Sequence, residues 1–336
     1  MQQGESRWKD AGGHASFIFN RLLRAVPVLL GIAVLNFLLI QLVPGDAADV
    51  LVGEAGAASP EFMADVRARF GLDQPLHIRF GLYLWNLIHF DMGYSFRFGL
   101  PVSKLLLSHL GPTLLLMLTA ITLAFCSGVF FGVLAARLVN RWPDAVISVV
   151  ALVVYATPVF WFGLMLIVLF AVQLGWLPSG GYETVGAGYV GIKHVLDVCR
   201  HMVMPVTVLS LFLMALYVRL MRASMLDVAG LEFVTTARAK GLSENQIAYR
   251  HVLRNSILPM VTMLGLQVGA MLGGSVLIET VFAWPGLGRL AYSAVFQRDI
   301  NLLLGLLLMA SCMVILTNVL TDLVYRFIDP RIGADR

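Results

Sequence analysis

Residues 113–136 read TLLLMLTAITLAFCSGVFFGVLAA, a run of 24 residues without Lys, Arg, Asp or Glu. A helix needs about 20 mostly apolar residues to cross a bilayer, because every backbone N–H and C=O in the hydrocarbon core must be bonded inside the helix. Five further charge-free runs approach or exceed this length: residues 26–43, 145–172, 202–218, 256–278 and 302–321. The sequence therefore predicts an all-α membrane protein with six transmembrane helices.

The composition of the 336-residue chain agrees with this prediction. Hydrophobic residues make up 59% and charged residues only 13%, and the mean hydropathy is +0.82. These values exclude a water-soluble enzyme. The 24 Lys and Arg against 20 Asp and Glu leave a net charge of +4, which is too small and too dispersed to indicate a nucleic-acid partner.

The distribution of Lys and Arg orients the predicted spans. With the N-terminus in the cytoplasm, 15 of these residues fall on inner segments and 9 on outer ones, which satisfies the positive-inside rule. The predicted order is a cytoplasmic segment 1–25, the first span 26–43, an extracytoplasmic cap 44–112, a core 113–322 that holds the cytoplasmic loop 219–255 and the outer segment 279–301, the sixth span 302–321, and a cytoplasmic tail 322–336. A cleaved signal peptide is the alternative for the first run, but five more spans follow it.

The cap between the first two spans is too long for a turn. Within it, Ser59 can cap a helix, Pro60 suits the first helical position and Gly71 suits the end. We expect a short amphipathic helix here. It would either dock an external partner or pack against the ends of the spans.

The predicted cytoplasmic loop 219–255 has the clearest local pattern. Residues 232–240 can form one short helix, and Gly241 suits the left-handed position after it. Ser243 followed by Gln246 makes a capping box that starts a second helix. Such a pair of helices could contact a cytoplasmic protein; the alternative is a solvated basic loop that only sets the topology.

Small and polar residues mark two further features of the spans. Gly265, Gly269 and Gly273, and likewise Gly128 and Gly132, recur at intervals of four, which lets a neighbouring helix approach or opens a pathway. Candidate pathway or gate residues are Tyr155, Thr157, Gln267, Ser275, Glu279 and Asn318. These polar groups could face a wet lumen or hydrogen-bond between helices. The outer residues 284–288 (WPGLG) could form a re-entrant gate or a turn.

Several mechanisms are disfavoured by what the sequence lacks. None of the four lysines completes the G-x-x-x-x-G-K-[ST] pattern of a phosphate-binding loop. The six spans carry no charged residue for ion coupling, and His201 at a span edge is more typical of a hydrogen-bonded structural residue. Paired aspartates and H-E-x-x-H are absent from the spans, so we expect no enzyme. A subunit of a larger machine fits these absences; a stand-alone secondary transporter or channel is the alternative.

Seven motifs together carry a resemblance to a known family. They are VPGD (43–46), GLDQPL (71–76), GWLPSGGY (175–182), TARAKGLS (236–243), RHVLRNSILP (250–259), VFAWPGLGRL (281–290) and DPR (329–331). With these motifs the chain resembles the membrane-spanning permease subunit of bacterial peptide-type ABC importers, the dipeptide, oligopeptide, glutathione and nickel group. The resemblance covers nearly the whole chain and implies the type I importer permease fold.

The resemblance also implies site residues in the cytoplasmic loop. In such importers this loop inserts into a cleft on the ATP-binding subunit, and the matching positions are Thr235, Thr236, Ala237, Arg238, Lys240, Gly241 and Ser243. The wider family pattern begins with Glu-Ala-Ala, so this chain departs from it at the first two positions. It also has Arg254 where that pattern has a proline.

The partners follow from the resemblance alone. They are a second, similar permease encoded by a different chain, two cytoplasmic ATP-binding subunits that hold ATP and Mg, and an extracytoplasmic solute-binding protein that docks on the cap. This chain itself would bind no cofactor. We expect it in the bacterial cytoplasmic (inner) membrane with both termini in the cytoplasm, importing peptides or similar small solutes.

Overall fold

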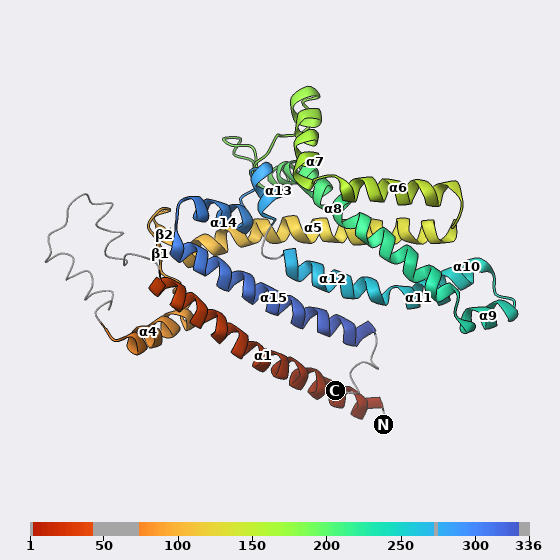
Figure 1. The fold of residues 1–336 in the computed structure, drawn as a ribbon, viewed down its shortest axis with the longest axis horizontal. Coiled ribbons are helices and arrows are strands. Elements are labelled where there is room, and N and C mark those ends of the chain that lie inside the picture. The colour runs from red at the N-terminus through yellow and green to blue at the C-terminus, as the bar shows by residue number, and fades with distance from the viewer. Residues whose placement is uncertain (1–2, 43–73, 272–274, 329–336) are drawn as a thin grey trace. The chain divides into compact units, whose positions relative to one another are not determined.

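A computed structural model describes residues 3–42, 74–271 and 275–328, and these residues are mostly helical (Figure 1). The predicted all-α class is therefore confirmed. The predicted helix between Ser59 and Gly71 lies outside the described residues. The chain divides into two compact units, one of residues 1–108 and 291–312 and the other of residues 109–290 and 313–336.

The smaller unit contains the N-terminal helix and the described part of the predicted cap. Its elements are α1 (Gln3–Leu42), α4 (Leu76–Ile88), the antiparallel hairpin β1 (Tyr94–Ser95) with β2 (Leu100–Pro101), the first turns of α5 (Val102–Arg137), most of α14 (Leu287–Phe296) and the first turns of α15 (Ile300–Ile328). Asp299 begins α15, because its Oδ1 accepts the Leu302 N–H at 3.1 Å. Its Oδ2 accepts the hydroxyl of the buried Ser95, which ties the hairpin to α15.

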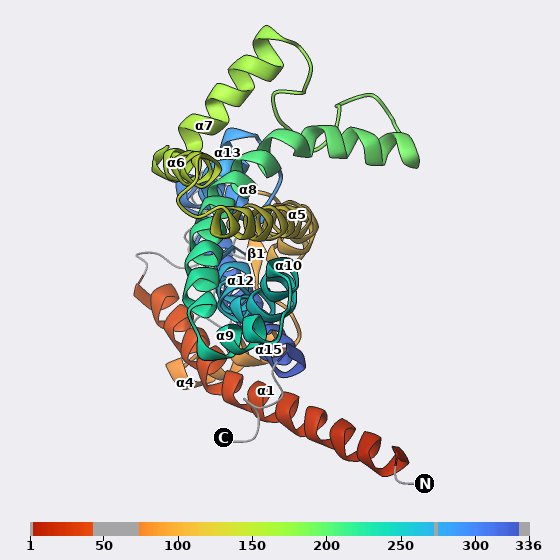
Figure 2. The same cartoon turned by 90° about the vertical axis from the view of Figure 1, so that its right-hand side faces the viewer.

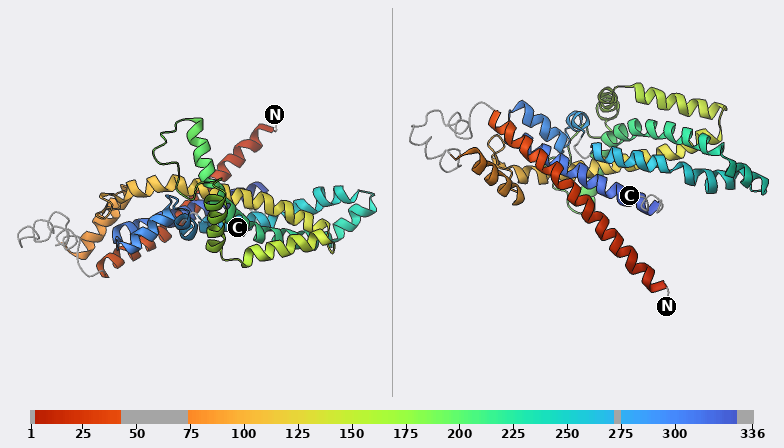
Figure 3. Two further views of the ribbon diagram at one scale, coloured as in Figure 1. Left: turned by 90° about the horizontal axis from the view of Figure 1, so that it is seen from above. Right: turned by 60° about the horizontal axis from the view of Figure 1, so that its bottom comes forward.

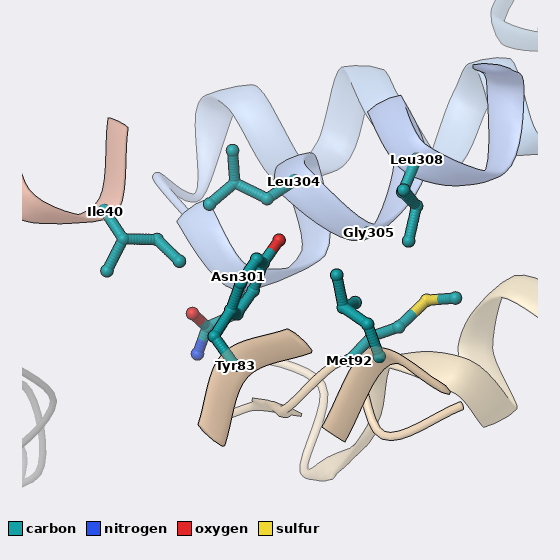
Figure 4. Close-up of a pocket in the computed structure, with 8 residues that line it drawn as sticks. Ile40, Tyr83, Met92, Asn301, Leu304, Gly305 and Leu308 are labelled. Carbon is teal, nitrogen blue, oxygen red and sulfur yellow. The ribbon is translucent and has the colours of Figure 1, made fainter. Parts of the chain in front are cut away.

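A small cavity of about 30 Å³ lies in the same unit (Figure 4). Ile40 of α1 and Tyr83 of α4 line one part of it, and Asn301 and Leu304 of α15 line another. The Asn301 Nδ2 donates to the backbone oxygen of Tyr94 at 3.0 Å, so it also holds the hairpin. The cavity has room for about one water molecule and does not suit a peptide-sized solute.

The larger unit contains the remaining helices. They are α5, α6 (Trp142–Ala156), α7 (Val159–Leu166) continued by the wider-wound η1 (Ile167–Gln173), α8 (Ile192–Ala229), α9 (Glu232–Ala239), α10 (Glu244–Gln246) with η2 (Ile247–Val252) and α11 (Leu253–Ser256), α12 (Leu258–Met271), α13 (Val276–Val281), the first turn of α14 and the end of α15. Figure 1 shows α6 lying along α8 and α7 turning away from the direction of α6. Figure 3 shows α8 and α12 running side by side toward α9 and α10.

Five of the six predicted spans have counterparts in the structure. Leu23–Leu42, α5, α8 and Ile300–Thr321 are long and apolar enough to cross a membrane, and α6 with α7 and η1 would make a fifth span as a bent pair. The predicted run 145–172 is not one straight helix, since its two halves meet at 98°. In the predicted run 256–278, Leu258–Val268 is a shorter apolar helix, and residues 272–274 lie outside the described part.

The bend follows from the sequence at Thr157-Pro158. Proline has no N–H for the helix ladder, and its ring pushes the preceding residue out of the helical region. Thr157 accordingly has φ −76° and ψ 129°, an extended conformation, and α7 starts directly after Pro158. The sequence analysis did not predict this break, because one proline hardly changes the mean hydropathy of a run of about 20 residues.

Glycines allow α5 to approach α8 closely, as the four-residue spacing predicted. A Cβ built on Gly132 would lie 2.6 Å from Met221 Cβ and 2.9 Å from the backbone oxygen of Val218, and Gly128 meets Tyr217 in the same way. On α12, a Cβ on Gly265 would lie 2.1 Å from Thr321 Cγ2. For these three glycines the structure favours helix packing over lining a pathway.

We predict that Gly132→Ala lowers the free energy of unfolding by about 1–3 kcal/mol, because α5 and α8 must separate to admit the methyl group. Gly111→Ala is the matched control in the same helix. Its Cβ meets nothing within 4 Å, so the higher helix propensity of alanine should leave the stability unchanged or slightly raised. Thermal unfolding in detergent, followed by tryptophan fluorescence, measures both; equal effects would contradict the packing argument.

Candidate functional site

The segment between α8 and α12, residues 230–256 and hereafter the loop segment, has one buried and one exposed face. Val234 and Ala237 of α9 and Ile247 of η2 are almost completely buried in a cluster with Met221 and Met225 of α8. α8 continues to Ala229, so the first part of the predicted cytoplasmic loop 219–255 is a continuation of that helix. The buried residues fix the segment to the end of α8, where it faces the viewer in Figure 2.

The exposed face carries six of the seven residues that the sequence indicated. They are Thr235, Thr236, Arg238, Lys240, Gly241 and Ser243. Ala237 is the exception, since it is 5% exposed and packs inside the chain. Leu231 and Phe233 are also exposed, at 49% and 39%. A surface that mixes threonine hydroxyls, cationic side chains and exposed apolar groups suits contact with another protein.

The turn between α9 and α10 has the conformation that the sequence predicted. Gly241 has φ +79°, and its N–H donates to the backbone oxygen of Arg238 at 3.0 Å. The capping box is formed: Gln246 N–H donates to Ser243 Oγ at 3.4 Å, and Ser243 N–H donates to Gln246 Oε1 at 3.0 Å. Both predictions are confirmed, and the turn is fixed by local bonds.

Two arginines join the loop segment to itself and to α5. Arg238 donates twice to Glu244, at 2.7 and 3.2 Å, and its guanidinium lowers the pKa of the Glu244 carboxyl. Arg137 at the end of α5 donates to Tyr249 Oη at 2.8 Å and to Asn245 Oδ1. The sequence indicated Arg137 only as a topology signal, and its role as an anchor was missed.

A buried ion pair joins α6 to α8 close to the loop segment. Arg222 donates to both carboxylate oxygens of Asp144, at 2.6 and 2.8 Å, and Asp144 is only 5% exposed. Asn140 N–H and Ser148 Oγ donate to the same carboxylate at 3.1 and 3.4 Å. The signal was present in the sequence as a carboxylate and an arginine at the ends of two predicted spans, but nothing in the sequence paired them.

Glu279 is completely buried where α5, α13 and α14 meet. Its Oε1 accepts the Thr113 hydroxyl at 3.2 Å, and its Oε2 accepts the Arg289 N–H at 2.9 Å. Thr113 Oγ1 accepts the Leu287 N–H at 2.7 Å. Burial outweighs these donors and raises the pKa of the Glu279 carboxyl. Glu279 therefore caps the first turn of α14, and both of its carboxylate oxygens accept hydrogen bonds from described residues of the chain.

The residues around Glu279 leave no room for larger side chains. A Cβ on Gly286 would lie 2.4 Å from the Glu279 carboxylate, and a Cβ on Gly288 would lie 3.0 Å from Oε2. The buried Trp284 donates from Nε1 to the backbone oxygen of Pro112 at 3.0 Å. The predicted alternatives for residues 284–288 were a gate and a turn; in the structure residues 284–286 connect α13 to α14, residues 287–288 begin α14, and the glycines pack tightly on the carboxylate.

The other predicted pathway residues are dispersed. Tyr155 is 44% exposed and stacks on Phe212. Gln267 and Ser275 are half-buried, Asn318 is exposed, and the Thr157 hydroxyl donates to the backbone oxygen of Val153. No common site among these residues is formed by the part of the chain that the structure describes.

We predict that Ser243→Ala lowers the stability of the second loop helix by about 1 kcal/mol, because the Gln246 N–H loses its acceptor. Hydrogen exchange of residues 244–249 should quicken, while exchange in α8 stays unchanged. Ser148→Ala, which removes a long hydrogen bond elsewhere, is the control. Unchanged exchange in the loop segment would show that the cap is not needed.

Comparison with known proteins gives the same assignment along nearly the whole length. Residues 128–334 match the family described as "Binding-protein-dependent transport system inner membrane component", and residues 15–117 match its N-terminal counterpart, "Binding-prot-dependent transport system membrane comp, N-term". A putative peptide transport system permease protein of Brucella abortus (strain 2308) is 38% identical over 95% of this chain and 99% of its own. The oligopeptide transport system permease protein AppB of Bacillus subtilis (strain 168) is 37% identical over the same shares.

The fold comparison points to the same class. The inward-facing MetNI methionine ABC transporter contains a chain that superimposes with a TM-score of 0.54, covering 67% of this chain and 97% of that one, at 17% identity. That likeness supports the type I permease fold. The family match over more than half of the sequence, the full-length relatives and the helical loop segment agree, and the chain belongs to the inner-membrane components of binding-protein-dependent transport systems as a permease subunit of an ABC importer.

Proposed function

We propose that this permease carries peptides or similar small solutes, that it forms half of the translocation pathway, and that the loop segment couples it to two cytoplasmic ATP-binding subunits. The relatives named above are described as peptide and oligopeptide permeases, which supports the solute class. ATP and Mg would be bound by the partner subunits. This chain would act as the transport subunit, with no catalytic role.

The observation that carries the coupling proposal is the division of α9 into two faces. Val234 and Ala237 pack in the core against α8. A displacement of the exposed side of α9, which carries Thr235 and Arg238, should therefore move α8 as well. Arg137 extends the same connection to α5. A rigid segment can switch the helices between two packings, which is what an importer driven from the cytoplasm requires.

The remaining partners are a second, similar permease for the other half of the pathway and an extracytoplasmic solute-binding protein that docks on the cap. We propose that the chain lies in the bacterial inner membrane with both termini in the cytoplasm, which the distribution of Lys and Arg supports. The competing proposal is a secondary transporter or channel that works alone. It does not explain why the loop segment is structured and exposes a surface suited to contact with another protein.

The test is an affinity pull-down of the tagged chain from gently solubilised membranes, with partners identified by mass spectrometry. ATP-binding subunits and a second multi-span subunit should be recovered. Gly241→Ile should lose the ATP-binding subunits, because a β-branched residue is strained at φ +79°.

Gly230→Ala is the matched control, since Gly230 has φ −81° and a Cβ there makes only an ordinary contact with Asp227 at 3.5 Å. It should retain every partner. Recovery of the chain alone, with solute transport after reconstitution without ATP, would overturn the proposal in favour of a secondary transporter or channel.

A further inference from the structure

Arg219 of α8 reaches away from the loop segment and lies over an aromatic ring. Its Cζ is 4.4 Å from the centroid of the Tyr155 ring. Helical arginine side chains point toward the N-terminus of their helix, which for α8 is the end opposite the loop segment. Tyr155 lies eleven residues beyond Asp144 on α6, or about 16 Å along the axis. The guanidinium is thus carried from the end of α8 toward the middle of the predicted run 145–172.

The tyrosine ring contacts both the arginine and a second ring. Phe212 stacks on Tyr155 at a centroid distance of 5.5 Å and an interplanar angle of 10°. Phe212 and Arg219 are two turns apart on the same side of α8. The stack holds the Tyr155 ring in place, and contact with that ring stabilises the cation.

Arg219 contrasts with Arg222, its neighbour one turn along α8. Arg222 is paired with Asp144 on both oxygens. Arg219 is exposed, and among the described residues it makes no ion pair. An arginine at this depth cannot face acyl chains at low cost, so its exposed side indicates a wet space or an anionic ligand.

The helix break next to Tyr155 is a second, independent sign of a wet space. Ala156 and Pro158 are exposed, and the backbone leaves the helix between them. Irregular backbone at membrane depth is tolerated where it is buried in protein or lines a water-filled cavity, and here it is not buried in this chain. The positive end of α7 also begins at Val159, four residues after Tyr155.

We propose that Arg219 and Tyr155 form a binding site in the translocation pathway for a solute carboxylate, such as the C-terminal carboxylate of a peptide. The site rests on the proposed peptide import and adds the group that recognises the solute. A guanidinium offers two parallel N–H donors to a carboxylate, and its weak hydration lets it bind and release the anion as the solute passes.

The first arm of the test uses the complete importer in proteoliposomes, with radiolabelled alanylalanine and its binding protein. Arg219→Gln should lower kcat for ATP-driven uptake roughly tenfold or more, the range expected for a lost charged hydrogen bond, with KM for the loaded binding protein unchanged. Arg219→Lys should recover part of the rate. Both variants should keep the wild-type Tm and partners, whereas Arg222→Gln, the structural control, should lower Tm.

The second arm replaces Tyr155 with cysteine in a chain whose Cys126, Cys199 and Cys312 are serine. An anionic methanethiosulfonate added from water should label position 155, and alanylalanine should slow the labelling while its C-terminal amide should not. Val153→Cys is the control, because Val153 is also exposed but lies about 200° around α6 from Tyr155. It should stay unlabelled.

The outcomes separate the two proposals. If the wild-type importer took up neither alanylalanine nor longer peptides, the proposed peptide import would be overturned, and the site with it. Normal wild-type uptake with full activity in Arg219→Gln, with no labelling at 155, or with equal protection by the amide would overturn the site and leave the proposed function standing. Loss of the second permease in Arg219→Gln would overturn the site as well, since the arginine would then serve assembly.

Discussion

Arg222→Ala is expected to lower the free energy of unfolding by about 3 kcal/mol or more, the largest effect of any single change near the loop segment. Asp144 is 5% exposed in the wild-type chain, and the substitution removes the cation that pairs with it. Two donors remain, Asn140 N–H and Ser148 Oγ, and neither carries a charge. Thermal unfolding in detergent should show a fall in Tm of about 5–10 °C.

Two control variants test whether the unpaired Asp144 carboxylate causes the loss of stability. Arg238→Ala breaks a pair of similar geometry with Glu244, but both side chains are more than half exposed, so the change in Tm should be small. Asp144→Ala combined with Arg222→Met removes both charges and should recover much of the stability. If the double variant were as unstable as Arg222→Ala, the stranded carboxylate would not be the cause.

The loop segment was predictable because its signals are local. Gly241, Ser243 and Gln246 each satisfy a backbone requirement within four residues, so the sequence alone determines the turn and the capping box. The spans were predictable for a similar reason, since a long apolar run has few alternatives. The bend at Pro158 falls within such a run, and an average over 20 residues does not resolve it.

The long-range pairs could not be predicted from one sequence. Asp144 and Arg222 are 78 residues apart, and Thr113 and Glu279 are 166 apart, so neither pair leaves a periodic signal. Glu279 was predicted as a candidate gate because it is an acid at a span end. The structure places it among the chain's own donors, and only the packing of α5 against α13 and α14 shows this.

Glu279→Ala is expected to destabilise the turn at residues 275–290 by about 3 kcal/mol. The Thr113 hydroxyl and the Arg289 N–H would lose their acceptor in a buried site, and each unsatisfied buried donor costs about 1–3 kcal/mol. Thermal unfolding followed through the completely buried Trp284 should report the loss. Glu279→Gln keeps the volume and one acceptor and should be intermediate.

The Glu279 carboxyl should also make the stability of the folded chain depend on pH. Burial raises its pKa above the ordinary value of 4.5, so the folded chain binds this proton more tightly than the unfolded chain. The stability that protonation contributes is therefore complete below pH 4.5 and is lost as the pH rises through the folded pKa. Wild-type Tm should fall relative to Glu279→Gln as the pH rises from 4.5 toward 8. A difference that grows in the opposite direction would mean that the carboxyl is held ionised by the N–H groups of α14, and that the electrostatics of the cap outweigh its burial.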